Sequence, residues 1–379
     1  MWYEVNITFT RRKEFFLFME VISTRTLFAK SEETQMLAEF YSKKFYFSYS
    51  SLNKLLWNPA AWFQHYVMRK REDKLDKHLL GGKVVHTLLL SQDFFNKLFV
   101  MVPNKLPGDN TMKVVHKVFK QYQEDLKTNT QSEMLSDYRS LILQILIEKN
   151  LHQSLTDDKP VKNSSEPVKS GNDKRVEKIL TQDAVEYFEH LIRKGSKDVI
   201  DNALLSECER AVSKIKSNLK IMDLLGFHSD EFRNIEVFNE YELQAELVNF
   251  PFGIKGIIDN LKIDHDYKII YINDVKTTGK ELAAFREAIE FWNYWMQAII
   301  YVMLVAKNFQ HLISDGYQIQ FRFIVIDVNG QVYSFPVSSE TMSKWKKRFI
   351  NEGLFKAQYH YTNKKFELPF EFSEELVIL

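Results

Sequence analysis

The clearest pattern of apolar and polar positions in the chain begins at Ile235. Apolar side chains fall on one parity and glutamates on the other, and only Asn239 interrupts the alternation. A period of two is typical of a strand with one face toward solvent. The apolar set is Ile235, Val237, Tyr241, Leu243, Ala245 and Leu247, and the polar set is Glu236, Glu240, Glu242 and Glu246. We therefore predict a strand whose glutamates share the wet face.

Further strands and one long helix follow. Turns at Pro251-Phe-Gly253 and at His265-Asp266 bound two more predicted strands, over 255–263 and 268–276. The pattern then predicts a helix over 281–306, a strand over 317–328, a hairpin at Asn329-Gly330 into 332–337, and a basic helix over 343–351. Helices followed by this β-β-β-α-β-β order predict the α/β class.

The part of the chain before these strands is mostly helical in pattern. Ser48 to Ser51 offers hydroxyls that can cap a helix starting near Leu52. We predict an N-terminal extension of unknown role over 1–45 and one main domain over 46–379. That domain includes a mostly helical insertion at about 112–230, with a polar, proline-containing mobile loop at 156–173.

Composition bounds the function. The single cysteine, Cys208, excludes an internal disulfide framework and a multi-cysteine zinc or iron–sulfur site. No apolar run approaches the roughly 20 residues of a membrane-spanning helix, and the start has no signal-peptide layout. We expect a cytoplasmic protein with no membrane partner. The 51 basic and 50 acidic residues nearly cancel, so any nucleic-acid contact depends on local charge.

The chemistry gathers around two predicted strands. Asp274 and Lys276 stand two apart, so their side chains share a face, and the turn near His265 would bring Asp259 close to Asp274. Two converging carboxylates favour a hard divalent cation such as Mg²⁺ or Mn²⁺. A neighbouring lysine could then assist water that attacks a phosphodiester. The alternative is a surface ion pair, but the residues 269–272 are apolar on both faces, as in a central strand.

Five separated motifs resemble, in order, those of the PD-(D/E)XK nuclease superfamily, in particular RecB-type nuclease domains and the RecE (exonuclease VIII)-like phage nucleases. The motifs are Ser48-Tyr-Ser-Ser51 with Leu55 and Asn58-Pro59, Gly82-Lys-Val-Val-His86, Gly256-Ile-Ile-Asp259, Asp274-Val-Lys276-Thr-Thr278, and Gln297 with Tyr301. The resemblance implies a restriction-endonuclease-like core, which is a mixed β-sheet flanked by helices, with the helical insertion.

The resemblance also implies roles for individual residues. Asp259, Asp274, the carbonyl of Val275 and His86 would bind Mg²⁺ or Mn²⁺, and Lys276 would be the catalytic lysine. Gln297 and Tyr301 share one helix face that would look toward the active site and the DNA end, and they are counted with the catalytic residues. Glu246 is an auxiliary acid by conjecture, since Glu240 and Glu242 share its predicted face. The alternatives without a catalytic role are that His86 is a core histidine with its hydrogen bonds made inside the protein, and that Gln297 and Tyr301 are a partly buried polar pair on a core helix.

Two basic clusters are candidates for phosphate contact. The first gives the nucleic-acid-binding set Ser50, Ser51, Lys54, Arg69, Lys70 and Arg71, and the second consists of Lys344, Lys346, Lys347 and Arg348. A solvated helix face explains these residues equally well. Trp57, Trp62 and Tyr66 could stack on bases, although a role in the core is favoured.

The resemblance implies a metal-dependent DNA exonuclease that degrades linear duplexes from their ends, in recombination or end processing in a bacterial or phage-infected cell. A single-strand annealing protein as partner and a homo-oligomer are implied in the same way. No G-x-x-x-x-G-K-[ST] motif is present, so the chain carries no motor of that kind. Two alternatives stay open: a nuclease-fold protein that binds DNA or protein without cutting, and an endonuclease of a defence system.

Overall fold

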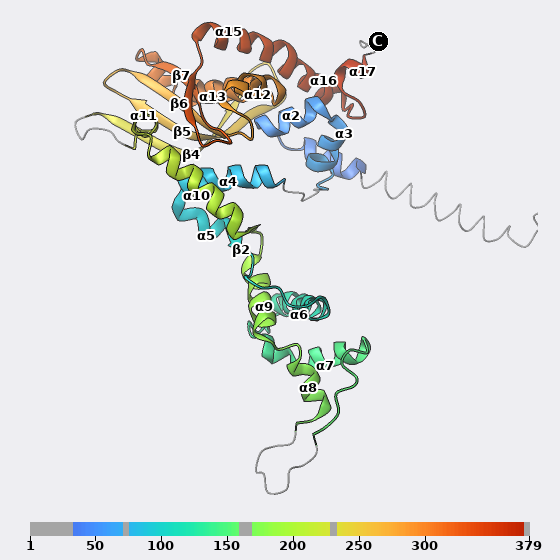
Figure 1. The fold of residues 1–379 in the computed structure, drawn as a ribbon. Helices are drawn as coiled ribbons and strands as arrows, with labels where there is room; N and C mark the ends of the chain where they lie inside the picture. The colour runs from blue at the N-terminus through green and yellow to red at the C-terminus, as the bar shows by residue number, and fades with distance from the viewer. Residues whose placement is uncertain (1–32, 71–75, 159–168, 228–232, 375–379) are drawn as a thin grey trace, which may run out of the picture. The chain divides into compact units, whose positions relative to one another are not determined.

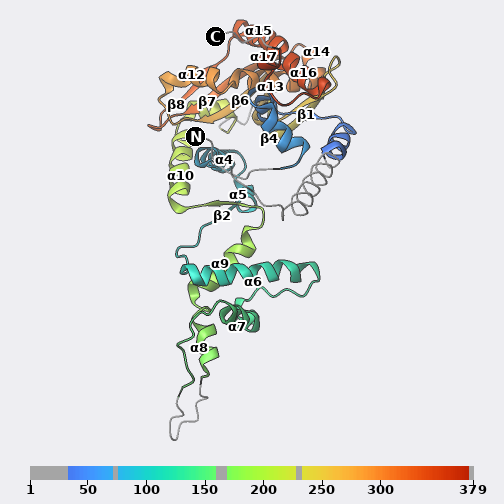
Figure 2. The same ribbon diagram turned by 90° about the vertical axis from the view of Figure 1, so that its right-hand side faces the viewer.

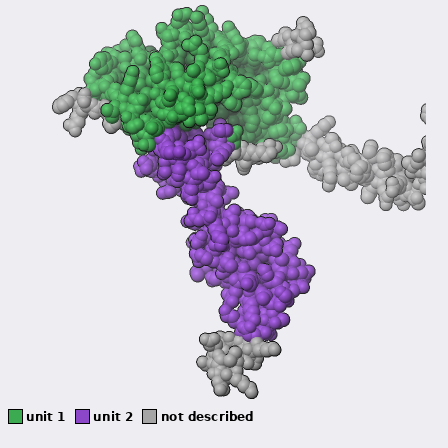
Figure 3. Space-filling view, viewed as in Figure 1, with its two compact units in different colours: residues 1–76, 213–379 green, residues 77–212 purple. Residues whose placement is uncertain are grey.

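The computed structural model describes residues 33–70, 76–158, 169–227 and 233–374. The chain forms two compact units, which Figure 3 shows in different colours. The sheet unit consists of residues 1–76 and 213–379, and the helical unit of residues 77–212. Most of the predicted N-terminal extension and of the predicted mobile loop lies outside the described residues, so those boundaries stay predictions. No described helix is both long and apolar enough to cross a membrane.

The sheet unit is built on a mixed sheet of six strands, which confirms the predicted α/β class with a mixed sheet flanked by helices (Figure 1). The order is β1-β5-β6-β7-β8, with β4 also paired to β5, and only the β1–β5 and β6–β7 pairs are parallel. The strands are β1 (Tyr46–Phe47), β4 (Ile235–Glu246), β5 (Gly253–Asp264), β6 (Ile269–Thr277), β7 (Gln318–Ile326) and β8 (Val332–Pro336).

Strand β5 has a gap along one of its edges. β4 pairs with β5 along its whole length, from Gly253 to Asp264, and so occupies one edge. β1 pairs at residues 253–254 and β6 at residues 260–264, so both must use the other edge. Among the described strands, residues 255–258 therefore have no ladder partner on that edge. Asp259 lies between this gap and the first residue paired with β6, Asn260, where a side chain or a ligand can approach the sheet.

Helices of the sheet unit cover the core face of the sheet. The central one is α13 (Tyr294–Asn308), which contacts β4, β5 and β7 and lies on the same side as α15 (Ser339–Arg348) (Figures 1 and 2). Two further described helices of this unit, each of nine residues, are α2 (Tyr49–Trp57) and α16 (Phe355–Asn363). The helix predicted over 281–306 is interrupted, because α12 (Phe285–Phe291) ends before Asn293, which has a φ of 57°. The left-handed residue breaks the helical path.

The alternation along β4 changes face within the strand. Leu243 and Ala245 belong to the main hydrophobic core, as predicted. Val237, on the same sequence parity, instead lies against Gly226, at the end of α11 (Leu219–Leu225). Between them Glu240 has a φ of 49°, which interrupts the pleat and exchanges the parity that faces the core. The prediction of one continuous wet face is therefore wrong for this strand.

The helical unit has its own hydrophobic core. Residues such as Val118, Ile142 and Phe188 are fully buried in it. Its main helices are α4 (Lys77–Leu90), α6 (Asp109–Lys127), α7 (Arg139–Glu148), α9 (Gln182–Lys194) and most of α10 (Asn202–Lys216). Two short strands, β2 (Phe99–Met101) and β3 (Asp198–Ile200), pair in parallel. The one cysteine, Cys208, is buried here as a free thiol, and burial raises its pKa to about 11, so it is no reactive thiolate at neutral pH.

Candidate metal centre

Two aspartates lie across from each other on the central strands of the sheet unit. The β5–β6 ladder ends with the pair Asn260 and Asn273, so Asp259 and Asp274 occupy the next opposed positions. The Oδ2 atom of Asp259 accepts a hydrogen bond from the backbone N–H of Val275 at 2.8 Å. Both aspartates are buried, Asp274 completely. Buried carboxylates are costly without compensating charge, which marks this position as a functional candidate.

Lys276 supplies part of that compensating charge. Its Nζ atom lies 2.5 Å from Oδ2 of Asp274 and 5.0 Å from the ring centre of Tyr294. Burial alone would lower the pKa of Lys276, but the carboxylates of Asp274 and Asp259 outweigh it and raise the pKa above its ordinary value. Lys276 is therefore a fixed cation beside the two carboxylates.

Glu240, rather than the predicted Glu246, is the glutamate that lies near Asp259. Carboxylate oxygens of Glu240 and Asp259 lie within 4.8 Å of each other. The β4–β5 ladder is interrupted at this point, between the pairs Asn239–Asn260 and Tyr241–Ile258, where Glu240 adopts its left-handed conformation. A third carboxylate thus joins the site by a local break in the pleat.

Glu246 lies elsewhere on the same strand. It pairs with Gly253, six positions along β5 from Asp259, and its carboxylate contacts the Lys44 ammonium and the Tyr46 hydroxyl. These two contacts hold the Glu246 carboxylate next to Lys44 and Tyr46. The pleat break at Glu240 separates the faces of the two glutamates, so Glu246 does not share the position of Glu240 beside Asp259. The role of Glu246 as an auxiliary acid stays a prediction.

Gln297 and Tyr301 on α13 complete the buried polar group. The Nε2 atom of Gln297 donates to the Tyr301 hydroxyl at 2.8 Å, and its Oε1 atom has no hydrogen-bond partner among the described residues. Burial, and then the negative charges of Asp259 and Asp274, raise the pKa of Tyr301 well above its usual range. The Tyr301 hydroxyl is therefore neutral and can donate a hydrogen bond, and it lies close enough to both aspartates to interact with their charges.

The glycine of the Gly256-Ile-Ile-Asp259 motif has a packing reason. A Cβ atom at Gly256 would lie 3.0 Å from the ring of Tyr301 and 3.2 Å from Leu304. That is tighter than ordinary van der Waals contact, so a larger residue would push α13 away from β5. Gly256 thus sets the distance between the aspartate strand and the Gln297–Tyr301 pair.

Two tyrosines near the site were not predicted as site residues. Tyr294 lies under the Lys276 ammonium, and the Tyr49 hydroxyl donates to the backbone carbonyl of Trp292. Burial, followed by Tyr294 and Asp274, raises the pKa of Tyr49. Tyr49 stands inside the Ser48-Tyr-Ser-Ser51 motif, so the motif itself was the available signal. An Asn293–Asn53 hydrogen bond of 2.9 Å also holds α2 against the start of α13.

A ladder of three amides, of which Asn260 and Asn273 are buried, connects β4 and the two aspartate strands to α11. Asn273 donates to Asn260 at 2.6 Å, and Asn260 donates to Asn239 at 2.8 Å. The same two side chains also donate to the backbone carbonyls of Leu224 and Leu225. In the chain, the three asparagines are direct neighbours of the three carboxylates: Asn273 precedes Asp274, Asn260 follows Asp259, and Asn239 precedes Glu240. The ladder therefore fixes the backbone that carries all three carboxylates.

The predicted nucleic-acid set divides into structural and exposed residues. Ser51 is buried and forms a capping box with Ser48 at the start of α2, so its hydroxyl serves the helix. Ser50 and Lys70 are exposed, Arg69 pairs with Glu39 at 3.0 Å, and the Lys54 ammonium lies 3.4 Å from the His65 ring. Arg71 lies outside the described residues. None of this tests DNA binding, which stays a prediction for these residues.

The aromatic residues of that region behave differently from one another. Trp62 is fully buried and stacks with Phe366 at 5.2 Å, so it belongs to the core as favoured. Tyr66 packs against the same core. Trp57 is 61% exposed and touches Phe291 edge-on.

Two predicted metal ligands keep that status only as predictions. His86 lies half-buried on α4 of the helical unit. For Val275 the structure shows that its backbone N–H donates a hydrogen bond to Asp259. The predicted metal ligand is the carbonyl oxygen of Val275, so this contact does not test that prediction. The donor set of the sheet unit nevertheless fits a metal. The carboxylates of Glu240 and Asp259, whose oxygens lie within 4.8 Å of each other, offer hard oxygen ligands of the kind that Mg²⁺ and Mn²⁺ prefer, and Asp274 lies across from Asp259 on β6. The Oε1 atom of Gln297, which has no hydrogen-bond partner among the described residues, is a further buried polar atom.

Comparison with known proteins gives a distant likeness in structure only. No family model matches the chain, and no curated protein matches it. Four chains of solved structures match. One is the crystal structure of a "Putative exonuclease" from Eubacterium rectale, with 11% identity, 92% of this chain and 91% of that chain covered, and a TM-score of 0.42. Because both the identity and the score are low, this likeness supports no conclusion about activity.

Proposed function

We propose that the protein is a divalent-metal-dependent nuclease that hydrolyses DNA phosphodiesters. One observation carries the proposal. Asp259 and Asp274 occupy opposed positions at the open end of the β5–β6 ladder, and Lys276 lies on the same face, 2.5 Å from Asp274. A pair of buried carboxylates with a fixed cation beside them suits metal-assisted hydrolysis of a phosphodiester.

The residues divide the work by their chemistry. Asp259, Asp274 and Glu240 would hold Mg²⁺ or Mn²⁺, which supplies Lewis-acid activation and charge neutralisation when bound. Lys276, kept protonated by its carboxylate neighbours, would stabilise negative charge that develops on the phosphate. The Tyr301 hydroxyl, oriented by Gln297, would orient the substrate strand.

Finer features of the proposal rest on the sequence resemblance. They are exonuclease action on linear duplex ends, His86 as a nitrogen ligand that favours Mn²⁺, a single-strand annealing partner and a homo-oligomer. The carboxylates and Lys276 support hydrolysis as such and are compatible with each feature.

The test is cleavage by the purified chain. Linear duplex labelled at the 5′ or 3′ end and covalently closed circular plasmid are incubated with Mn²⁺ or Mg²⁺, with EDTA as the metal-free control. We expect the linear substrate to be degraded and the closed circle to be spared. The Asp274→Ala variant should lose at least about 100-fold in rate, and Glu242→Gln, which removes an exposed charge on β4, should keep it.

Each other outcome has a meaning. Activity that persists in Asp274→Ala would place catalysis elsewhere or in a contaminant. Rapid nicking of closed circles would replace the exonuclease by an endonuclease. Tight DNA binding without cleavage under either metal would replace the nuclease by a binding protein.

A further inference from the structure

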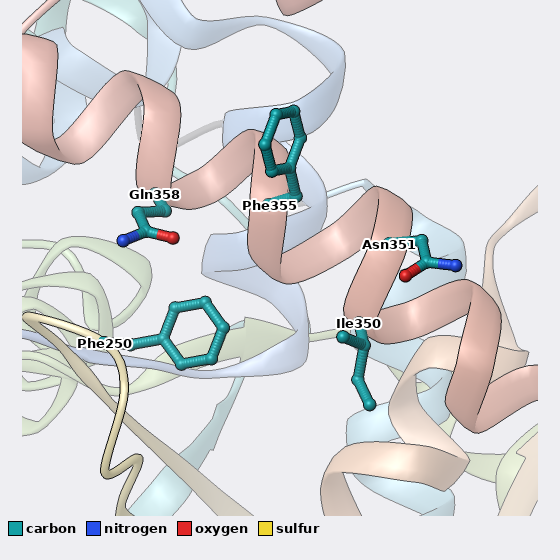
Figure 4. Close-up of a pocket in the computed structure, with 5 residues that line it drawn as sticks. All are labelled: Phe250, Ile350, Asn351, Phe355 and Gln358. Atoms are coloured by element: carbon teal, nitrogen blue, oxygen red, sulfur yellow. The ribbon is translucent and has the colours of Figure 1, made fainter.

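The sheet unit has a pocket of about 390 Å³ away from the carboxylates. It is lined by Phe250, Ile350, Asn351, Phe355 and Gln358 (Figure 4). Phe250 comes from the turn between β4 and β5, and the other four come from the continuous helical segment that includes the π-helix η5 (Phe349–Leu354) and α16. π-helical turns occur frequently at functional sites, because the widened turn changes which side chains point outward.

Two aromatic rings of the pocket are held from behind. Phe355 contacts the ring of Phe370 edge-on at 5.5 Å, and Phe250 contacts the ring of Phe252 at 5.4 Å. Phe355 is nevertheless 54% exposed. A large apolar ring that is braced on one side and open on the other offers a stacking surface at low entropic cost.

Two side-chain amides share this pocket. Neither Asn351 nor Gln358 has a side-chain hydrogen-bond partner among the residues that the structure describes. An amide offers one acceptor and two donors, which match the polar edges of nucleobases.

Cations adjoin the pocket on the same helical segment. In α15, Lys344 pairs with Glu340 at 2.7 Å, and Arg348 pairs with Glu290 at 2.7 Å. Lys346 and Lys347 are exposed, and within the described ranges neither forms an ion pair. Lys347 precedes Asn351 by four residues, so it lies one turn away along the segment. Unneutralised ammonium groups beside an aromatic pocket favour a polyanion that carries flat rings.

We propose that this pocket binds an unpaired nucleobase, with the adjoining phosphates of the same strand on Lys346 and Lys347. The proposal rests on the proposed nuclease function and names its substrate as DNA with a single-stranded portion. The volume lies within the range of small-molecule pockets, so one base fits. Phe250 precedes the first residue of β5 by three positions, and Asp259 lies six positions further along that strand, so the bound base and the phosphodiester at the carboxylates would belong to different nucleotides.

The test measures binding and not cleavage. Fluorescence anisotropy of a labelled 12-nucleotide single strand is followed in EDTA, with the Asp274→Ala chain as the parent protein. Phe250→Leu with Phe355→Leu keeps apolar volume and removes both rings, and Phe372→Leu, which alters a 55% exposed phenylalanine outside the pocket, is the matched control. We expect the double variant to bind roughly five- to a hundredfold more weakly, the loss that one base stack gives, and the control to bind as the parent does.

An abasic strand and the lysines separate the parts of the site. The parent should bind a strand without bases more weakly, and the double variant should no longer distinguish it from the intact strand. Lys346→Gln with Lys347→Gln should weaken binding of both strands equally and reduce the slope of log affinity against log salt by about 1.4. Equal affinity of parent and double variant, or of intact and abasic strands for the parent, would overturn the proposal.

The two proposals fail separately. A chain that binds base-dependently but never cleaves would keep the pocket and lose the nuclease. A chain that cleaves, with pocket variants that bind single strands like the control, would keep the nuclease and lose the pocket. Thermal unfolding of every variant confirms that a weaker signal comes from a folded protein.

Discussion

The Asp259 carboxylate accepts the Val275 backbone N–H at 2.8 Å, at the point where the β5–β6 ladder stops. A side chain therefore takes the place of the backbone acceptor that the next rung of the ladder would provide. This contact ties the proposed metal ligand to the strand that carries Asp274. The position of Asp259 is consequently a property of the sheet and does not depend on a bound ion.

Asp259 should tolerate loss of its charge better than loss of its acceptor. Asp259→Asn keeps an oxygen for the Val275 N–H, so we expect it to unfold in urea close to wild type in EDTA. Asp259→Ala removes this buried hydrogen bond and should cost about 1–3 kcal/mol. Both should lose Mn²⁺ affinity in calorimetric titration. Equal stability of the two variants would show that the hydrogen bond contributes nothing.

Glu240 should show a trade between stability and metal affinity. Its φ of 49° is a left-handed conformation that is costly for a residue with a Cβ atom. Glu240→Gly should therefore be about 1 kcal/mol more stable than Glu240→Gln by chemical unfolding. Both variants should bind Mn²⁺ more weakly than Glu242→Gln. If both bound it as well as that control, Glu240 would not be a ligand.

Gly256 should be needed for activity more than for folding. Gly256→Ala places a methyl group 3.0 Å from the Tyr301 ring, so α13 must shift by a few tenths of an ångström. We expect the free energy of unfolding to fall by about 1–3 kcal/mol. We expect the activation free energy of cleavage to rise by more than that, because the Gln297–Tyr301 pair moves with the helix. Gly279→Ala, where a Cβ atom meets nothing within 4 Å, is the matched control. A fully active Gly256→Ala protein would contradict this packing role.

His360 should make stability depend on pH on the acidic side. Its ring is completely buried, its Nδ1 lies 2.6 Å from the Lys365 carbonyl oxygen, and burial lowers its pKa below 6.5 despite that contact. Below about pH 6.5 the unfolded chain binds a proton that the folded chain does not, so the free energy of unfolding falls as the pH falls. The slope from this residue is at most about 1.4 kcal/mol per pH unit, and it vanishes well above pH 6.5.

Urea unfolding of wild type and His360→Gln between pH 5.5 and 8 measures this contribution. The two curves of stability against pH should converge toward the acidic end. Curves that stay parallel over the whole range would show that His360 does not titrate in the unfolding reaction.

Much of the site follows from short-range rules. Period-two spacing placed Asp274 and Lys276 on one face, and a turn near His265 was enough to oppose Asp259 to Asp274, as the register of β5 and β6 shows. The class of the fold followed from the order of helices and strands. These features depend on residues close in sequence, so the sequence pattern could predict them.

Other features depend on a single backbone angle or on distant packing. The sequence alternation predicts that Glu240 and Glu246 share one face of β4. The left-handed backbone angle at Glu240 exchanges the faces of the strand, so the two glutamates lie on different faces and Glu246 contacts Lys44 instead. Asn239 was the one irregular residue of the alternation, and the break comes one residue later. The interruption at Asn293 and the approach of Tyr49 to the site likewise depend on contacts with residues more than 200 positions away.

The division of the sheet unit between the two ends of the described chain has a consequence for synthesis. β1 pairs with β5, and the Tyr41 hydroxyl donates to the carbonyl of Tyr361, 320 residues later, at 2.7 Å. At about 5–20 residues per second, a ribosome needs roughly 10–40 s to pass from Phe47 to its sheet partner. During that interval the aromatic residues around Phe47 have no sheet to cover them. The helical unit, whose core is contiguous in sequence, can close first, so the early N-terminal segment is the part of the nascent chain most exposed to chaperones and to aggregation.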